Sequence, residues 1–348
     1  MPSPGTQRTI VRTLLSLPIP MLRLMAGGGV VYQGGRTLDP RLQYLAAQAR
    51  GTPAMTGFSP QEARVGSAMS LAVMTGDIEP GVRVESLDIP GPAGTIPARL
   101  YRPEAQDSKA PVMVFGHFGG GVIGDLETCH VFCSILAKTA RGPVLSVDYR
   151  LAPEHRFPAG LEDMLAAYRW GRDNAERFGA PAAQAAVGGD SMGGNFAAVV
   201  CQELKKAGEP QPTLQLLIYP WVDVACESAS MTTYGDAFPL TRATLDWFAG
   251  HYMGPGDSPA DTRLSPLRAT DVSGLAPAIV VTAGFDPLLD QGEAYARRLK
   301  EAGVPVIYRC YDSLAHAFTA FTGAVPCADV ACREVAGLVR EGFEGRIA

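Results

Sequence analysis

Short apolar runs that alternate with helical stretches dominate the chain from residue 112 onward. Because these runs are nearly continuous in apolar residues, they are typical of strands in a parallel sheet covered on both faces by helices. Upstream, two β-type runs flank a turn at Pro90–Gly94 and predict an antiparallel hairpin. The eight predicted strands are Val82–Ile89, Thr95–Tyr101, Val112–Phe115, Val144–Val147, Ala185–Val187, Leu214–Ile218, Ile279–Thr282 and Val306–Cys310. We therefore expect an α/β fold with one eight-stranded, mostly parallel sheet.

The predicted sheet takes up too much of the 348 residues to leave two independent domains. Leucines at helical spacing and the start signal Ser59-Pro60 predict helices across residues 38–75. A further helix is predicted at Thr241–Tyr252, in a stretch without strands between the sixth and seventh strands. We expect residues 1–80 and 223–266 to form a cap over the edge of the sheet, and residues 81–222 and 267–348 to form the main domain.

The N-terminus carries an apolar stretch, Leu14–Met25, that follows Arg8 and Arg12. Prolines interrupt it, among them Pro18, and no clear signal-peptidase site follows. The stretch is also shorter than the ~18 uninterrupted apolar residues of a membrane span. We interpret it as an amphipathic cap or partner-contacting segment, with a secretory signal or a membrane-surface anchor as the alternative. Stable membrane insertion is not expected.

Charge and cysteine content exclude several classes of binding partner and metal site. The chain has 30 Lys and Arg against 35 Asp and Glu, a net charge of −5, with no run of basic residues. Nucleic acid and anionic membrane surfaces are therefore not expected as primary partners. The seven cysteines are odd in number and form no CxxC pair, so neither a disulfide framework nor a zinc site is indicated. Free cysteines favour a reducing, cytoplasmic location and no bound metal.

The sharpest local signal is Gly188–Asn195, which follows a predicted strand and precedes the helical run Phe196–Lys206. Within it, Ser191 stands between Gly189 and Gly193 in a G-x-S-x-G pattern. In a strand–turn–helix, glycines at these two positions remove side chains where the turn crowds the backbone, so the serine hydroxyl is exposed above the sheet. The alternative is a structural glycine-rich turn with no catalytic role. We predict that Ser191 is a nucleophile.

A serine hydroxyl needs a neighbouring base, and a histidine is the usual one. Enzymes that carry a serine on such a turn have their acid and then their histidine later in the chain. Two of the five histidines follow Ser191. His251 lies in the predicted cap helix, before any strand that could supply the acid. His316 follows the last predicted strand, so we predict that His316 is the base and not a surface histidine.

The acid is expected at the end of a strand between the serine and the histidine. Asp286 lies in the loop after Ile279–Thr282. Asp290 begins the following helix, where a carboxylate has a capping role of its own. We predict that Asp286 orients the imidazole of the base and that Asp290 caps the helix.

Acyl transfer also needs N–H donors for the developing oxyanion, and Phe115–Gly121 after the third strand is a loop that could supply them. A glycine-rich loop can instead bind phosphate, but no Lys-Ser/Thr follows this one and it lacks the G-x-G-x-x-G pattern.

These motifs together resemble the bacterial hormone-sensitive-lipase-like esterases of the α/β-hydrolase superfamily, over nearly everything from residue 38 onward. The matching segments are Asp148–His155, Gly189–Gly194, Tyr219–Asp223, Asp286–Leu288 and His316–Phe318. The resemblance implies the α/β-hydrolase fold, hydrolysis of small carboxylic esters, and a cap built from the N-terminus and an insertion after the sixth strand. It also implies no cofactor and a triad of Ser191, Asp286 and His316.

The chain departs from this family at one place. The family loop reads His-Gly-Gly-Gly-aromatic, whereas this chain reads His117-Phe118-Gly119-Gly120-Gly121, so that Phe118 replaces the first glycine and Gly121 the aromatic residue. The family's donors carry over to Gly119 and Gly120, with the Met192 N–H as the third. A shift to Gly120 and Gly121 is the alternative.

Two aromatic side chains are candidates for the substrate pocket. The ring of Phe118 either packs against His117 and the sheet or points into the pocket, and we favour the pocket because Gly121 leaves a place empty. Trp221 either lines the pocket or belongs to the core.

The expected function is hydrolysis of short-chain carboxylic esters through an acyl-enzyme intermediate. The alternatives are a lipase or a peptidase-like hydrolase of the same superfamily, and a non-catalytic binding protein on this fold. The expected partners are a small-molecule ester and, as an option, a second copy of the chain in a homodimer.

Overall fold

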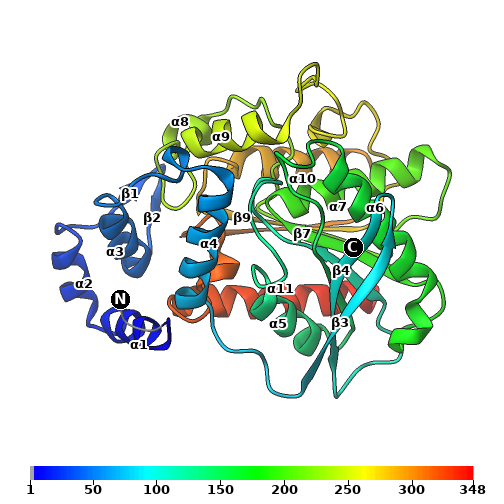
Figure 1. Cartoon of the computed structure of the whole chain (residues 1–348), viewed down its shortest axis with the longest axis horizontal. Helices are drawn as coiled ribbons and strands as arrows, with labels where there is room; N and C mark the ends of the chain where they lie inside the picture. Colours follow the sequence, from blue (N-terminus) through cyan, green and yellow to red (C-terminus); the bar gives the residue numbers. More distant parts are fainter. Residues whose placement is uncertain (1–3, 348) are drawn as a thin grey trace.

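The strands of the computed structural model, which describes residues 4–347, form one large sheet and one small one (Figure 1). The strands of the large sheet are β3 Val82–Gly91, β4 Gly94–Pro103, β5 Val112–Gly116, β6 Val144–Val147, β7 Ala185–Asp190, β8 Gln215–Ile218, β9 Ala278–Phe285 and β10 Val306–Ala315. Their order is β10-β9-β8-β7-β5-β6-β4-β3. Only β4 runs antiparallel to its neighbours, β3 and β6. The expected eight-stranded, mostly parallel sheet is confirmed. The small sheet pairs β1 Tyr32–Gln33 with β2 Arg36–Thr37.

Several strands extend beyond the apolar runs that predicted them. In the hairpin, Gly91 pairs with Gly94, so only Pro92 and Ala93 form the turn and the predicted five-residue connection is too long. β9 continues to Phe285, which pairs with Ala315 of β10. Small residues after the apolar run hid this continuation, because a ladder can extend wherever the neighbouring strand supplies partners.

Helices cover both faces of the large sheet. The α-helices among the described residues are α1 Pro4–Leu15, α2 Ile19–Met25, α3 Pro40–Ala49, α4 Pro60–Met74, α5 His130–Ala140, α6 Ala159–Asp173, α7 Met192–Lys206, α8 Ala229–Thr233, α9 Arg242–Tyr252, α10 Leu289–Glu301 and α11 Pro326–Phe343. One core cluster holds Met164, Phe196 and Tyr295 from α6, α7 and α10. The other holds Phe132 and Val335 from α5 and α11. The two faces therefore have separate cores with the sheet between them.

The N-terminal stretch forms helices interrupted by proline. α1 and α2 meet at Pro18, and each buries one leucine, Leu15 and Leu22 respectively. α4 begins as the start signal predicted: the Ser59 hydroxyl and the Glu62 carboxylate bond to each other's backbone N–H in a capping box. Within residues 4–347, no helix has the length and apolar character that a membrane crossing requires.

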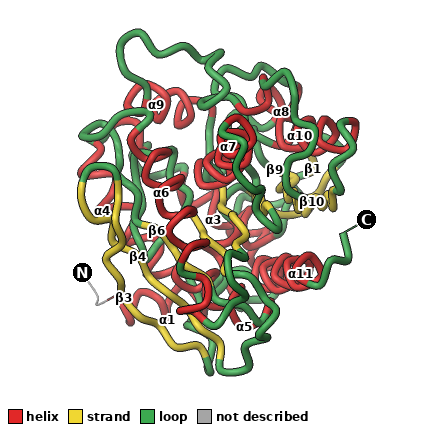
Figure 2. Tube along the Cα trace, turned by 90° about the vertical axis from the view of Figure 1, so that its right-hand side faces the viewer, coloured by secondary structure: helices red, strands yellow, loops and turns green. Residues whose placement is uncertain are grey.

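The insertion between β8 and β9 contains α8, α9 and no strand, as expected. In both views, α8 and α9 lie at the top of the molecule and α5 lies at the bottom (Figure 1, Figure 2). α9 begins at the predicted position, because the Thr241 hydroxyl accepts a hydrogen bond from Thr244 N–H.

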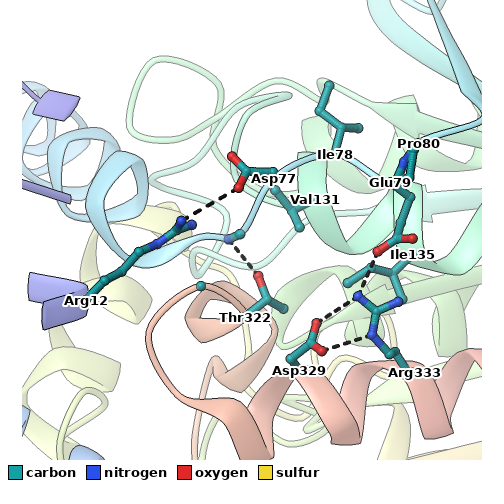
Figure 3. A pocket seen from close by; sticks show the side chains of 12 residues that line it. Arg12, Asp77, Ile78, Glu79, Pro80, Val131, Ile135, Thr322, Asp329 and Arg333 are labelled. Atoms are coloured by element: carbon teal, nitrogen blue, oxygen red, sulfur yellow. Dashed lines mark hydrogen bonds and ion pairs between the residues drawn. The ribbon is translucent and has the colours of Figure 1, made fainter. Parts of the chain in front are cut away.

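The linker from α4 to β3 is fastened to the body of the protein beside a cavity of about 460 Å³ (Figure 3). Asp77 pairs with Arg12 of α1, and Glu79 pairs with Arg333 of α11 at 2.7 Å. Arg333 also pairs with Asp329. The charges around this cavity thus neutralise one another, and none of the predicted site residues lines it.

Candidate active site

The turn between β7 and α7 holds Ser191 in a conformation that is rare for a residue with a side chain. Its φ is 54° and its ψ is −111°. Backbone crowding explains the flanking glycines: a Cβ at Gly193 would overlap the carbonyl oxygen of Gly116, and one at Gly189 would overlap the backbone of Gly193. The turn is fixed by hydrogen bonds from Ser191 N–H to Ile218 O and from Asn195 N–H to Ser191 O. This is the geometry that the G-x-S-x-G pattern predicts.

Ser191, His316 and Asp286 meet at the carboxyl ends of the strands. His316 Nε2 lies 3.0 Å from Ser191 Oγ, and His316 Nδ1 lies 2.7 Å from Asp286 Oδ2. Asp286 is fully buried, and its other oxygen accepts a hydrogen bond from Leu288 N–H at 2.8 Å. Because the carboxylate holds the Nδ1 proton, Nε2 is left as the acceptor for the serine hydroxyl.

The two residues that the sequence offered as alternatives lie elsewhere. His251 is on α9, where its ring contacts Trp247 with centroids 4.5 Å apart. Asp290 lies inside the first turn of α10 and makes no cap for it: its carboxylate accepts a hydrogen bond from Ser230 N–H at 2.7 Å. The predicted capping role of Asp290 is therefore wrong, because α10 begins one residue earlier and the carboxylate turns toward α8.

The loop after β5 presents three consecutive glycines, Gly119, Gly120 and Gly121, all with positive φ. Its own turn is closed by hydrogen bonds from two following N–H groups to Gly119 O, and Ala152 N–H bonds to Gly121 O at 2.8 Å. Within residues 4–347, the N–H groups of Gly119, Gly120 and Met192 bond to no protein acceptor. They are therefore free to donate to a ligand.

His117, at the start of this loop, is a buried and neutral histidine. Its Nδ1–H donates to Phe118 O at 2.7 Å, and its ring stacks on Tyr149 with centroids 4.3 Å apart. The Tyr149 hydroxyl donates to His117 O at 2.7 Å. Burial lowers the pKa of His117 to about 4. His117 thus supports the loop as an uncharged ring.

The two predicted pocket residues differ in exposure. Phe118 is half-buried, packs against the core cluster on the α5 side and has no positive φ. Trp221 is 2% exposed, and its backbone N–H donates a hydrogen bond to the backbone carbonyl of Ser191 at 3.1 Å. Whether either ring contacts substrate stays a prediction.

Sequence reasoning missed a polar cluster beside the serine. Asp190 is fully buried and accepts hydrogen bonds from Tyr219, Thr319 and Cys129. Burial raises the pKa of Asp190 to about 6. The Tyr219 ring also lies against His316, with centroids 4.6 Å apart. Since these residues come from four separate segments, spacing in the sequence gave no signal for the cluster.

Sequence reasoning also missed two rings of α9, Phe248 and Tyr252, that lie on Gly120 and Gly121. In the sequence, only their position in the predicted cap helix connected these two rings with the site.

The side chains of the triad are covered by the surrounding protein, because Ser191 and His316 are each only 5% exposed. No group of three or more His, Cys, Asp or Glu side chains within residues 4–347 is arranged to hold a metal ion.

The low pKa of His117 predicts a pH effect on stability. Between pH 6.5 and about 4, His117 binds a proton in the unfolded chain but stays neutral in the folded protein. His117 therefore makes the free energy of unfolding fall as the pH falls. His117→Gln, which stays neutral, should flatten this fall. The measurement is chemical denaturation from pH 7 to pH 4, comparing slopes between the two proteins. Equal slopes would contradict the prediction.

Comparison with known proteins agrees with the fold. A family model described as alpha/beta hydrolase fold matches residues 113–320. Carboxylic ester hydrolase LipN of Mycobacterium tuberculosis is 44% identical, over 88% of this chain and 84% of that protein. Ethyl acetate hydrolase of Pseudomonas putida is 37% identical, over 79% of this chain and 88% of that protein.

Solved structures give the same result. An α/β hydrolase enzyme from the metagenome of Lake Arreo, Spain, superposes with a TM-score of 0.84 at 42% identity, covering 88% of this chain and 99% of that one. The family model spans well over half of the chain, and the relatives are similar along most of their length. The chain therefore belongs to the hormone-sensitive-lipase-like esterases of the α/β-hydrolase family.

Proposed function

We propose that the protein is a serine carboxylesterase that hydrolyses short-chain carboxylic esters, with Ser191 as nucleophile, His316 as general base and Asp286 as the carboxylate that orients it. One observation carries the proposal: His316 bridges Ser191 and Asp286, at 3.0 Å and 2.7 Å, above a strained strand–turn–helix. A serine, an imidazole and a buried carboxylate in this order are the elements of acyl transfer.

The chemistry follows from the orientation of the imidazole. His316 Nε2 takes the Ser191 proton as Oγ attacks the ester carbonyl carbon, and Asp286 stabilises the imidazolium that forms. The imidazolium then protonates the alcohol, which leaves, and an acyl-serine remains. His316 next takes a proton from water, whose oxygen attacks the acyl carbon, and the acid is released as Ser191 regains its proton.

The negative charge on the carbonyl oxygen needs donors that are already in place. We assign this role to the N–H groups of Gly119, Gly120 and Met192, which correspond to the donors of the family that the chain resembles. Within residues 4–347 none of these N–H groups has a protein acceptor, and the same holds for Gly121. A shift to Gly120 and Gly121 remains the alternative assignment. We further propose Phe118 and Trp221 as walls of the substrate pocket.

The preference for short esters rests on the cover over the site. We propose that residues 1–80 and 223–266 form this cap on a main domain of residues 81–222 and 267–348. Ser191 is 5% exposed beneath it, which favours small substrates over lipid aggregates. The relative named ethyl acetate hydrolase supports the same substrate class. A lipase, a peptidase-like hydrolase and a non-catalytic binding protein are the competing assignments.

The cellular setting and the partners are proposed from the cysteines, the net charge and the exposed apolar residues. All seven cysteines are free, which supports a reducing, cytoplasmic location. The net charge of −5 supports an absence of nucleic-acid binding. Leu24 on α2 is 76% exposed and its neighbours Ile19 and Met21 are also exposed, which supports a homodimer.

Replacing Ser191 by Ala should reduce kcat by about 10⁴-fold or more, and His316→Ala should be comparably damaging. His251→Ala serves as the matched control, because this ring packs on Trp247 of α9 while His316 makes both hydrogen bonds of the triad, and it should change kcat by less than about 3-fold. The measurement is steady-state hydrolysis of p-nitrophenyl acetate by purified, folded variants. More than a few per cent activity in Ser191→Ala, or a reversal of the two histidine phenotypes, would refute the assignment.

A series of p-nitrophenyl esters tests the substrate class. We expect kcat/KM to be highest for acyl groups of roughly two to six carbons, because one surplus methylene in a closed apolar pocket changes selectivity by about 10-fold or more. A maximum on long-chain emulsions would make the protein a lipase, and hydrolysis of peptides but not esters would make it a peptidase.

Phe118→Ala separates the two positions that the sequence left open for this ring. If the ring lines the pocket, as we expect, the variant should change acyl selectivity and keep its kcat for the acetyl ester. A fall in kcat of about 10²–10³-fold for all esters alike would instead show that Phe118 supports the oxyanion loop.

A further inference from the structure

The inner face of α9 places two aromatic rings on the glycines of the oxyanion loop. Phe248 and Tyr252 are four residues apart, so they lie on the same face of the helix. They are 6% and 2% exposed. A Cβ at Gly120 would overlap the Phe248 ring, and one at Gly121 would lie 2.7 Å from Tyr252 Cδ2. The two rings therefore leave no room for a side chain at residues 120 and 121, so both positions require glycine.

Position 121 is where the loop departs from the pattern of the esterases it resembles, which carry an aromatic residue there. In this chain, Tyr252 lies against that position, so an aromatic side chain at residue 121 would collide with it. The space that Gly121 leaves open is therefore filled by a ring from α9, so it is not the empty place that favoured a pocket position for Phe118.

Tyr252 is held firmly in this place. Its carbonyl accepts a hydrogen bond from Phe157 N–H at 2.9 Å. Its ring packs on Phe157 in a T-shaped arrangement and on Phe196 in a tilted one, with centroids 5.9 Å and 6.4 Å apart. Its hydroxyl is buried without a hydrogen-bond partner within residues 4–347. The aromatic ring, and not the hydroxyl, therefore accounts for its packing.

We propose that Phe248 and Tyr252 are further specificity-determining residues of this esterase, and that Tyr252 replaces the aromatic side chain missing at position 121. The proposal rests on the proposed function. An ester carbonyl bound to Gly119 and Gly120 N–H lies beside the rings that cover this loop, so those rings limit the length of the acyl group. On this proposal, the length of the acyl group is limited by residues of α9.

The first test measures kcat/KM for p-nitrophenyl esters from acetyl to dodecanoyl in Phe248→Ala and Tyr252→Ala. Each should raise the ratio of octanoyl to acetyl hydrolysis by about 10-fold or more. Tyr252→Phe keeps the ring and should keep the wild-type profile. Asp246→Ala, on the exposed side of α9, is the matched control and should also leave the profile unchanged.

An unchanged octanoyl-to-acetyl ratio in active Phe248→Ala and Tyr252→Ala would overturn the proposal. So would a uniform fall in kcat for all esters, because it would mean that the rings only support the loop. Fluorophosphonate labelling of Ser191 in each variant separates these results from a failure of the proposed function: an unlabelled, inactive wild type would overturn the esterase assignment itself.

The second test moves the ring back to the loop. Gly121→Phe should lose most activity, because the new ring collides with Tyr252. In the double variant Gly121→Phe/Tyr252→Ala the ring has room, and kcat/KM for the acetyl ester should recover by about 10-fold or more over Gly121→Phe. The strain at φ +72° is common to both variants and cancels from the comparison. A double variant no more active than Gly121→Phe would contradict the replacement.

Discussion

The contact between the turn at Ser191 and the end of β5 is the constraint on which the rest of the site depends. Ser191 keeps φ at 54° only because the glycines around it allow backbones to approach where side chains would collide. Gly189 pairs with Gly116 in the sheet register, and Gly193 abuts the Gly116 carbonyl. One contact therefore joins the turn that carries the proposed nucleophile to the strand that leads into the proposed oxyanion loop.

The parallel sheet supplies the other groups at the same edge. β9 and β10 are neighbours, and the loops after them carry Asp286 and His316. Behind the imidazole, Tyr219 packs against His316 and donates a hydrogen bond to Asp190. Asp190, next to Ser191, is thus linked through Tyr219 to the ring of His316. Asp190, directly before Ser191, joins three separate segments at the site, because its hydrogen-bond donors are Tyr219, Thr319 and Cys129.

Local features of the sequence were sufficient to locate most of the strands, the capping box at Ser59 and the turn that carries Ser191. Apolar runs, Ser59-Pro60 and the glycines around Ser191 act within a few residues, so the pattern alone predicts their geometry. His316 could be chosen because few histidines follow Ser191 and a parallel sheet brings strand ends together. Contacts between distant segments left no such signal. Phe248 and Tyr252 lie more than a hundred residues from the glycines they cover, and Asp290 was misread because its partner belongs to another helix.

The central claim is that Ser191 is the residue acylated during turnover. Intact-protein mass spectrometry after treatment with a fluorophosphonate, followed by peptide mapping, tests it directly. Our account predicts one phosphonyl group per chain, located on Ser191, appearing in step with the loss of esterase activity. An adduct on another residue, or full loss of activity with Ser191 unmodified, would contradict it.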